Sequence, residues 1–193
     1  VVQDRAIGVD ADSRTLELAE GPALAYDKLV LAPGIAMRWA AIEGYDEEAA
    51  LIMPHAFQAG TQTRLLKEQV LGMREGGTFL MVAPPNPYRC PPGPYERASM
   101  IAHQFAQHNP TAKILILDAK PGFSKQPLFE EAWRTRYSGM IEWVPGDFGG
   151  KAVAVDPVAM TVTNADGEVF AADVVNCIPP QQAGLVAAAA GAT

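Results

Sequence analysis

The sequence predicts an α/β protein in which a Rossmann-like module with a parallel sheet carries an added β-meander. Three observations lead to this fold class. Apolar segments of strand length alternate with segments of helical periodicity between residues 57 and 144. Two stretches of 26 residues, 9–34 and 155–180, align with each other without a gap. Both stretches read as short alternating strands joined by turn-forming residues.

The first predicted helix covers residues 57–73. Leu66 and Val70 are apolar at helical spacing, and charged residues lie between them. Two glycines at residues 76–77 end this segment, because glycine is common just past a helix. The apolar run TFLMV that follows, residues 78–82, is predicted to be a strand.

The second helix is predicted at residues 95–108, where Ala98, Ile101 and Phe105 form one apolar face and Pro110 follows the end. This segment is followed by an apolar strand, a third helix and a third strand, at residues 113–118, 128–137 and 140–144. Strands that alternate with helices in this way form a parallel sheet with right-handed crossovers.

The two aligned stretches share residues at the positions that matter for folding. The coinciding pairs are Val9/Val155, Asp10/Asp156, Thr15/Thr161, Gly21/Gly167, Ala25/Ala171, Asp27/Asp173 and Pro33/Pro179. In each stretch the pattern predicts a meander and then an apolar strand that ends at the proline. The sequence NADGE at residues 164–168 predicts a hairpin turn, because Asp-Gly tolerates positive φ.

The second stretch completes an α/β module, and by analogy the first stretch closes a module whose head is missing. We therefore expect a truncated, two-module chain. Residues 1–40 would be the C-terminal remnant of the first module, residues 41–180 a complete module of the dinucleotide-binding type without a nucleotide fingerprint, and residues 181–193 the start of a segment that returns to the first module. The alternative is a single domain with an N-terminal β-meander.

Composition excludes several classes of function. The net charge is −7 and there is no Lys/Arg run, which argues against nucleic acid and anionic membranes as partners. No apolar run reaches the ~20 residues of a transmembrane helix. Two cysteines and three histidines, without ligand spacing, predict no metal site. We expect the histidines to be structural or exposed.

The segment between the strand at 78–82 and the following helix is where a Rossmann module holds a pyrophosphate. Here the loop, APPNPYRCPPGP at residues 83–94, is rich in proline, and G-x-G-x-x-G occurs nowhere in the chain. Proline has no N–H to offer a phosphate and fixes φ. Asp118 follows the next strand, where a ribose-binding acid would lie, but this position alone is weak support for a dinucleotide.

The loop offers a thiol instead. Cys90 lies just before a predicted helix N-terminus and next to Arg89, and both features favour the thiolate. Glu96, in the first turn, is a candidate proton donor or acceptor, although acids are also common there for their effect on the dipole. Cys177 aligns with Leu31 inside an apolar strand, which predicts a small buried residue.

Several segments, taken together, resemble the flavoprotein subunit of flavocytochrome c sulfide dehydrogenase, over essentially the whole chain. The most specific is the cysteine loop YRCPPGPYERAS; YDKLVLAPG is shared with other disulfide-reductase-like flavoproteins, including sulfide:quinone oxidoreductases. The matching segments are residues 26–35, 77–99, 114–129, 140–146 and 178–184.

The resemblance implies an FAD enzyme of the bacterial periplasm that oxidises sulfide through a redox-active cysteine pair and passes electrons to a c-type cytochrome subunit. Cys90 matches the first cysteine of that pair, and Glu96 matches the acid proposed as the active-site base. Ala32, Pro33 and Gly34 match the strand end that approaches FAD.

This sequence lacks the family's FAD fingerprint, its flavin-attachment cysteine, the partner of Cys90 and the late Gly-Asp motif. We therefore expect a chain that, as it stands, is inactive. Two alternatives stay open. One is a non-catalytic module that docks an electron-transfer partner, and the other is the NAD(P)H-binding module of a related flavoenzyme.

Overall fold

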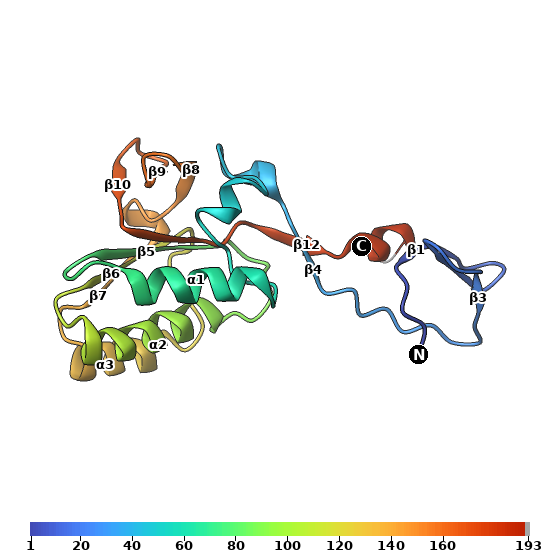
Figure 1. Ribbon diagram of the computed structural model, residues 1–193, viewed down its shortest axis with the longest axis horizontal. Coiled ribbons are helices and arrows are strands. Elements are labelled where there is room, and N and C mark those ends of the chain that lie inside the picture. Colours follow the sequence, from blue (N-terminus) through green and yellow to red (C-terminus); the bar gives the residue numbers. More distant parts are fainter. Residues whose placement is uncertain (192–193) are drawn as a thin grey trace. The chain divides into compact units, whose positions relative to one another are not determined.

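The computed structural model describes residues 1–191 and divides into two compact units. The larger unit is Arg38–Pro180, and the smaller one combines Val1–Met37 with the chain from Gln181 onward. Figure 1 labels the elements of both units. The end of the predicted return segment, residues 192–193, lies outside the described residues.

A four-stranded parallel sheet forms the centre of the larger unit. Its strand order is β11-β5-β6-β7. The strands are β5 (Thr78–Ala83), β6 (Lys113–Asp118), β7 (Ile141–Val144) and β11 (Val174–Cys177). The predicted parallel sheet is confirmed, and the strands predicted at residues 78–82, 113–118 and 140–144 agree with β5, β6 and β7 to within a residue at either end.

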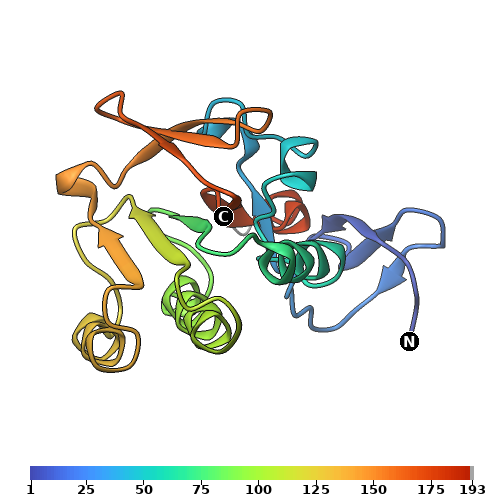
Figure 2. The same ribbon diagram turned by 60° about the vertical axis from the view of Figure 1, so that its left-hand side comes forward.

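Three helices cover one face of this sheet (Figure 1, Figure 2). They are α1 (Thr61–Gly72), α2 (Gly93–His108) and α3 (Gln126–Arg136). The prediction placed the start of the first helix too early, at residue 57. Gly60, with φ 109°, has a backbone conformation that no α-helix contains, so the helix begins after it.

The opposite face is covered by a three-stranded meander and by the segment that leads into the unit. The meander consists of β8 (Ala152–Asp156), β9 (Thr161–Asn164) and β10 (Val169–Ala171), and the leading segment contains the short 3₁₀ helices η1 (Trp39–Ala41) and η2 (Ala49–Leu51). A third 3₁₀ helix, η3 (Gly146–Phe148), precedes the meander. Leu80 and Val82 of β5 pack here with Val162 of the meander and Tyr45 of the leading segment. Because side chains alternate along a strand, Phe79 and Met81 face the helices.

The smaller unit contains β1 (Ala6–Asp10), β2 (Thr15–Leu18), β3 (Leu24–Ala25), β4 (Ile35–Met37), β12 (Gln181–Ala183) and α4 (Leu185–Ala189). The repeat predicted from the sequence is present in its backbone. The β1–β2–β3 ladder and the β8–β9–β10 ladder have the same register under the offset that relates Val9 to Val155. Arg14 and Met160, which occupy equivalent positions, both have φ 54°.

The same offset also relates β4 to β12, and these two strands pair with each other. In this antiparallel ladder Ala36 lies opposite its own equivalent, Gln182. On either side of this pair, Met37 lies opposite Gln181, which is the equivalent of Ile35, and Ile35 lies opposite Ala183, which is the equivalent of Met37. The structural repeat thus extends beyond the two aligned stretches, as far as β4 in the first copy and β12 in the second, which pair with each other.

The predicted apolar strand at the end of the first stretch is not formed. Residues 28–31 have no strand conformation, and Val30 is 89% exposed. The equivalent segment of the second stretch is β11, which is held by its parallel partner β5. Among the described residues, no strand pairs with residues 28–31. A lone strand would leave its backbone N–H and C=O groups without hydrogen-bond partners in a neighbouring strand.

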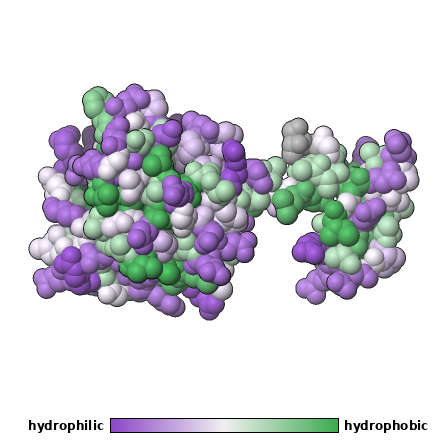
Figure 3. Space-filling view, turned by 90° about the horizontal axis from the view of Figure 1, so that it is seen from above, coloured by the Kyte–Doolittle hydropathy of each residue, from purple (hydrophilic) through white to green (hydrophobic). Residues whose placement is uncertain are grey.

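The predicted hairpin turn at residues 164–168 is confirmed. Gly167 has φ 83°, and the Asn164 side chain accepts hydrogen bonds from the backbone N–H groups of Asp166 and Glu168. Apolar residues are interspersed with polar ones on the surface in Figure 3. Among the described helices, none combines the length and the apolar character that a membrane crossing requires.

Tyr45→Phe is expected to lower the free energy of unfolding by about 1–2 kcal/mol, because a buried hydrogen bond is lost. The Tyr45 hydroxyl lies 2.8 Å from the carbonyl oxygen of Met53 and 2.9 Å from that of Cys177, so it joins the leading segment to β11. Urea denaturation measures the change. The matched control is Tyr137→Phe, whose hydroxyl is exposed; equal losses in the two variants would contradict the expectation.

Candidate functional site

The cysteine loop connects the end of β5 to the start of α2, at the carboxyl edge of the parallel sheet. In open α/β sheets this edge is where ligands bind. Cys90 is exposed and has φ 60°, a left-handed conformation that is unusual for a residue other than glycine. The Asn86–Pro87 peptide bond is cis. The Cys90 side chain is thus accessible to solvent at this edge of the sheet.

Cys90 packs against the first turn of α2. A Cβ atom at Gly93 would lie 3.2 Å from Cys90 Sγ and 3.4 Å from Phe57 Cζ. The Gly93 N–H donates a hydrogen bond to the Cys90 carbonyl oxygen at 2.8 Å. Pro94 lies in the first turn of the helix, where its missing N–H has no cost. The absence of a side chain at Gly93 thus leaves the space that Cys90 Sγ and the Phe57 ring use.

The Arg89 guanidinium contacts the preceding chain segment. Its Nη2 donates to the Phe57 carbonyl oxygen at 2.7 Å. Sequence reasoning had placed this group beside the thiol only by adjacency in the chain. The hydrogen bond instead ties the cysteine loop to residues 54–57.

Residues 54–57 are fixed in turn by two polar side chains, the half-buried Arg97 and the fully buried Asn176. Arg97 donates to the carbonyl oxygens of His55 and Ala56 at 3.1 and 2.5 Å, and to Asn176 Oδ1 at 2.9 Å. Asn176 Nδ2 donates to the Pro54 carbonyl oxygen at 2.6 Å. Burial lowers the pKa of Arg97 to about 10, so this residue remains a cation at neutral pH.

His55 is 3% exposed and belongs to the same network. Its Nδ1 accepts a hydrogen bond from the Phe57 N–H at 3.0 Å, which requires a neutral ring with an unprotonated Nδ1. Burial, and then the charge of Arg97, lower the pKa of His55 to about 4. The histidine is therefore structural, as predicted.

Glu96 lies in the first turn of α2, at the same end of the helix as Cys90, and is exposed. Its backbone N–H donates to the Pro92 carbonyl oxygen. The side chain borders a groove between α1 and α2 whose lining also includes Gly93 and Met100. The structure brings Cys90 and Glu96 to one end of one helix, and their catalytic roles stay predictions.

Asp118 is fully buried at the end of β6, and its carboxylate is saturated with hydrogen bonds. Oδ2 accepts from the Tyr95 hydroxyl at 2.5 Å and from Trp143 Nε1 at 3.0 Å. Oδ1 accepts from the backbone N–H of Lys120 at 3.1 Å and from its Nζ at 2.5 Å. A carboxylate with these four donors has no lone pair directed at a ribose hydroxyl. This geometry argues against the NAD(P)H-binding alternative.

Lys120 was missed by sequence reasoning. The signal was the sequence Asp118-Ala-Lys120 at a strand end, where residues two apart project to the same side. Trp143, which sequence analysis did not single out, also donates a hydrogen bond to Asp118.

Cys177, unlike Cys90, is not accessible to solvent. It is fully buried in β11, and burial raises its thiol pKa far above the usual range. Neither cysteine forms a disulfide. The prediction that Cys177 is a small buried residue is confirmed.

Ala32, Pro33 and Gly34 belong to the smaller unit, where they are exposed. Gly34 has φ 72°, and no atom lies within 4 Å of the position that a Cβ would take. Pro33 packs against Gly184, where a Cβ would lie 2.8 Å from the Pro33 carbonyl oxygen. An open backbone of this kind fits a flavin that approaches the main chain closely, and these residues offer it no charged side chain.

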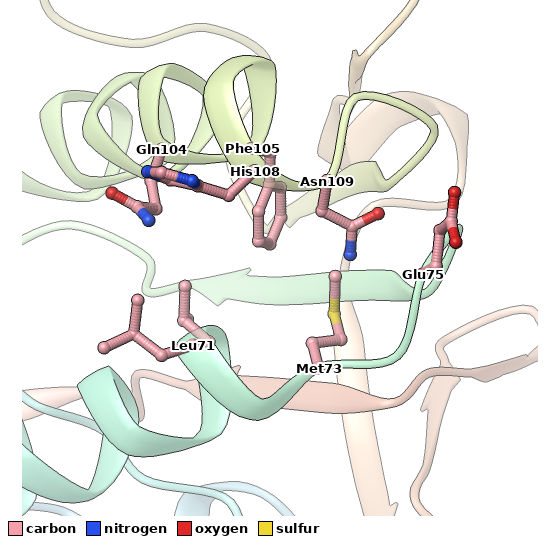
Figure 4. Close-up of a pocket in the computed structure, with 8 residues that line it drawn as sticks. Leu71, Met73, Glu75, Gln104, Phe105, His108 and Asn109 are labelled. Carbon is pink, nitrogen blue, oxygen red and sulfur yellow. The ribbon is translucent and has the colours of Figure 1, made fainter.

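Figure 4 shows a hollow between the C-terminal ends of α1 and α2, where Met73 and Phe105 point toward each other. Asn109, at its edge, accepts a hydrogen bond from the Gly76 N–H and donates one to the Arg74 carbonyl oxygen. The hollow lies near the amino end of the sheet, whereas the cysteine loop lies at the carboxyl end. No cluster of metal-ligating side chains occurs among the described residues 1–191.

Comparison with protein families gives one match, over residues 63–179. The matching family is the central part of the flavoprotein chain of sulfide dehydrogenase [flavocytochrome c]. The matched residues include the cysteine loop, α2, Asp118 and β11, and they form more than half of the chain.

Solved structures with the same fold include several oxidoreductases. Putidaredoxin reductase, in its covalent complex with putidaredoxin, has a TM-score of 0.68 at 17% identity over 97% of this chain and 43% of its own. The sulfide:quinone oxidoreductase of Aquifex aeolicus has a TM-score of 0.65 at 20% identity over 98% of this chain and 44% of its own. An NAD-dependent persulfide reductase from A. fulgidus has a TM-score of 0.61 at 16% identity, over 92% of this chain and 30% of its own. The chain thus spans less than half of the length of these structures.

Gly93→Ala is expected to raise the rate at which Cys90 is alkylated, because the new methyl group pushes Sγ away from the helix toward solvent. The effect on the free energy of unfolding should stay below about 1 kcal/mol, since alanine favours a helix. Peptide-level mass spectrometry after timed alkylation measures the rate. Gly72→Ala, at a position with nothing within 4 Å, is the control; equal Cys90 rates in both variants and the parent would contradict the prediction.

The stability of the larger unit is expected to fall as pH drops from about 6.5 to about 4. The folded state holds His55 neutral with a pKa of about 4, while the unfolded state binds a proton near 6.5. Stability is therefore full above pH 6.5, and about 3 kcal/mol is lost by pH 4. Urea denaturation across this range tests the slope.

His55→Asn keeps a side-chain acceptor for the Phe57 N–H and should flatten this slope, whereas His103→Asn, at an exposed position, should leave it unchanged. A slope that persists in His55→Asn would assign the pH dependence to other groups.

Proposed function

The chain belongs to the family of the flavoprotein chain of flavocytochrome c sulfide dehydrogenase, and we propose that it carries the sulfur-reactive cysteine of a flavin-dependent sulfide-oxidising enzyme. One observation carries the proposal. The edge of the sheet that holds a pyrophosphate in a dinucleotide-binding module here presents the exposed thiol of Cys90, in a loop where prolines have removed backbone donors.

In the proposed reaction Cys90 is first part of a disulfide with a second cysteine. Cys177 is buried inside β11 and does not meet the requirements of that partner. Hydrosulfide attacks Cys90 Sγ, a sulfur–sulfur bond forms to give a Cys90 persulfide, and the original disulfide bond breaks. The partner sulfur leaves as a thiolate, which holds the electron pair of the broken bond. Sulfide is oxidised and the disulfide is reduced in this step.

Glu96 is proposed as the base of the same step. It lies in the first turn of α2 and faces solvent, from which it exchanges protons freely. A carboxylate at this position can take the proton of hydrogen sulfide, or that of the persulfide once it forms.

FAD, when bound, supplies the acceptor for the two electrons. Ala32, Pro33 and Gly34 are the residues of this chain proposed to contact it, through the exposed backbone around Gly34. The family description names flavocytochrome c, which supports a c-type cytochrome subunit as the next electron carrier. We propose the periplasm as the site of this reaction, on the basis of the family resemblance alone.

Cys90→Ser is expected to abolish flavin reduction by sulfide in the longer, flavin-loaded protein that contains this chain, because the serine hydroxyl forms neither a disulfide nor a persulfide. Anaerobic absorbance spectroscopy of the flavin band measures the rate. Reduction by dithionite, which needs no cysteine, should be unchanged.

Cys177→Ala is the matched control. It removes the other thiol from a site that solvent does not reach, and it should retain sulfide-driven reduction at near the parent rate. Full activity in Cys90→Ser would exclude the proposed role, as would a loss in Cys177→Ala equal to the loss in Cys90→Ser.

A further inference from the structure

Lys120 is 5% exposed and contacts the cysteine loop at two places. Its Nζ donates to the carbonyl oxygen of Pro84, at the start of the loop, at 2.7 Å. The same Nζ lies 4.9 Å from the centre of the Tyr88 ring, two residues before Cys90, in a cation–π contact. One buried ammonium group therefore joins the start of the loop, at Pro84, to its middle, at Tyr88.

Tyr88 carries this restraint across Cys90. Its hydroxyl donates to the Pro91 carbonyl oxygen at 2.6 Å, so Tyr88 and Pro91 close the loop around Arg89 and Cys90. On the far side the Gly93 N–H holds the Cys90 carbonyl oxygen. The left-handed backbone of Cys90 is thus fixed by contacts on both sides of it in the chain.

Asp118 keeps Lys120 charged and in place. The carboxylate is itself held by Tyr95, by Trp143 and by the backbone N–H of Lys120. Burial lowers the pKa of Lys120, and the charge of Asp118 opposes this shift. Tyr95 stacks on Phe123, with ring centroids 3.6 Å apart, which closes this cluster with aromatic surface.

We infer that the buried Asp118–Lys120 ion pair is a positioning device for Cys90, built at the place where a dinucleotide-binding module has its ribose-binding acid. A buried ion pair is weak support for stability, because its desolvation offsets most of its attraction. Its hydrogen-bond geometry specifies one conformation of the loop, and that conformation sets the place and direction of Sγ.

This inference rests on the proposed role of Cys90, and its test requires neither sulfide nor flavin. Three variants are compared with the parent. Lys120→Met combined with Asp118→Asn removes the ion pair without leaving a buried charge unpaired. Lys120→Arg keeps the cation. Tyr88→Leu removes the aromatic contact and leaves the ion pair intact.

The readout is the rate at which iodoacetamide alkylates each cysteine between about pH 6 and pH 9, measured on the Cys90 and Cys177 peptides by mass spectrometry. Cys177 is an internal reporter of the fold, because it reacts only when β11 opens. Lys113→Met is the control. Lys113 lies at the other end of β6, and its Nζ donates to the Gly139 carbonyl oxygen at 2.6 Å, away from the loop.

In the double variant we expect the Cys90 rate to approach that of a cysteine in an unstructured peptide at every pH, while Cys177 stays protected. Tyr88→Leu should move the Cys90 rate in the same direction. Lys120→Arg and Lys113→Met should both keep the Cys90 rate of the parent. A purely stabilising ion pair would instead expose Cys177 and leave the Cys90 rate unchanged.

A Cys90 rate equal to the parent's in the double variant, with Cys177 protected, would overturn the inference. If the double variant loses its fold and Cys177 becomes reactive, Tyr88→Leu decides: a parent-like Cys90 rate in that variant also overturns it. Sulfide-driven flavin reduction that depends on Cys90 would stand in either case, since it requires the thiol and not this anchor.

Discussion

The structure depends on how the backbone leaves β5. In a dinucleotide-binding module that exit supplies free N–H groups to a pyrophosphate, but here prolines take their place and the chain must satisfy its remaining polar groups within itself. Lys120 binds the carbonyl oxygen of Pro84, Tyr88 binds that of Pro91, and Gly93 binds that of Cys90. These internal bonds leave the Cys90 side chain exposed to solvent.

The replacement of backbone N–H donors by prolines also accounts for the buried side chains around Asp118, beneath the loop. An acid at the end of β6 has no ribose to bind once the pyrophosphate cradle is lost, and a buried carboxylate without partners is costly. Lys120, Tyr95 and Trp143 supply those partners, and Lys120 uses its remaining donors on the loop. On the other side of the loop, Arg97 and Arg89 bind the carbonyl oxygens of residues 55–57. Backbone carbonyl oxygens on both sides of the cysteine are thus bound by cations: the buried Lys120, the half-buried Arg97 and the exposed Arg89.

Sequence reasoning predicted the parts of this fold that follow from local pattern. The apolar runs of β5 and β6, the face of α2 and the repeat of the meander all depend on residue order, and the observed elements agree with them. The strand expected at residues 28–31 failed because a parallel strand needs a neighbour, which no local pattern supplies. The contacts of Lys120 and Arg89 were also out of reach, since each joins segments brought together only by the fold.

The central claim is that Cys90 Sγ is the atom that hydrosulfide attacks, so that a persulfide forms on Cys90. Its most direct test is peptide-level mass spectrometry of the flavin-loaded protein, in its disulfide form, after a brief exposure to sulfide followed by alkylation. The account predicts added sulfur on the peptide that contains Cys90 and an unmodified Cys177. Added sulfur that is absent from Cys90, or protection of Cys90 from alkylation by NADH, would contradict it.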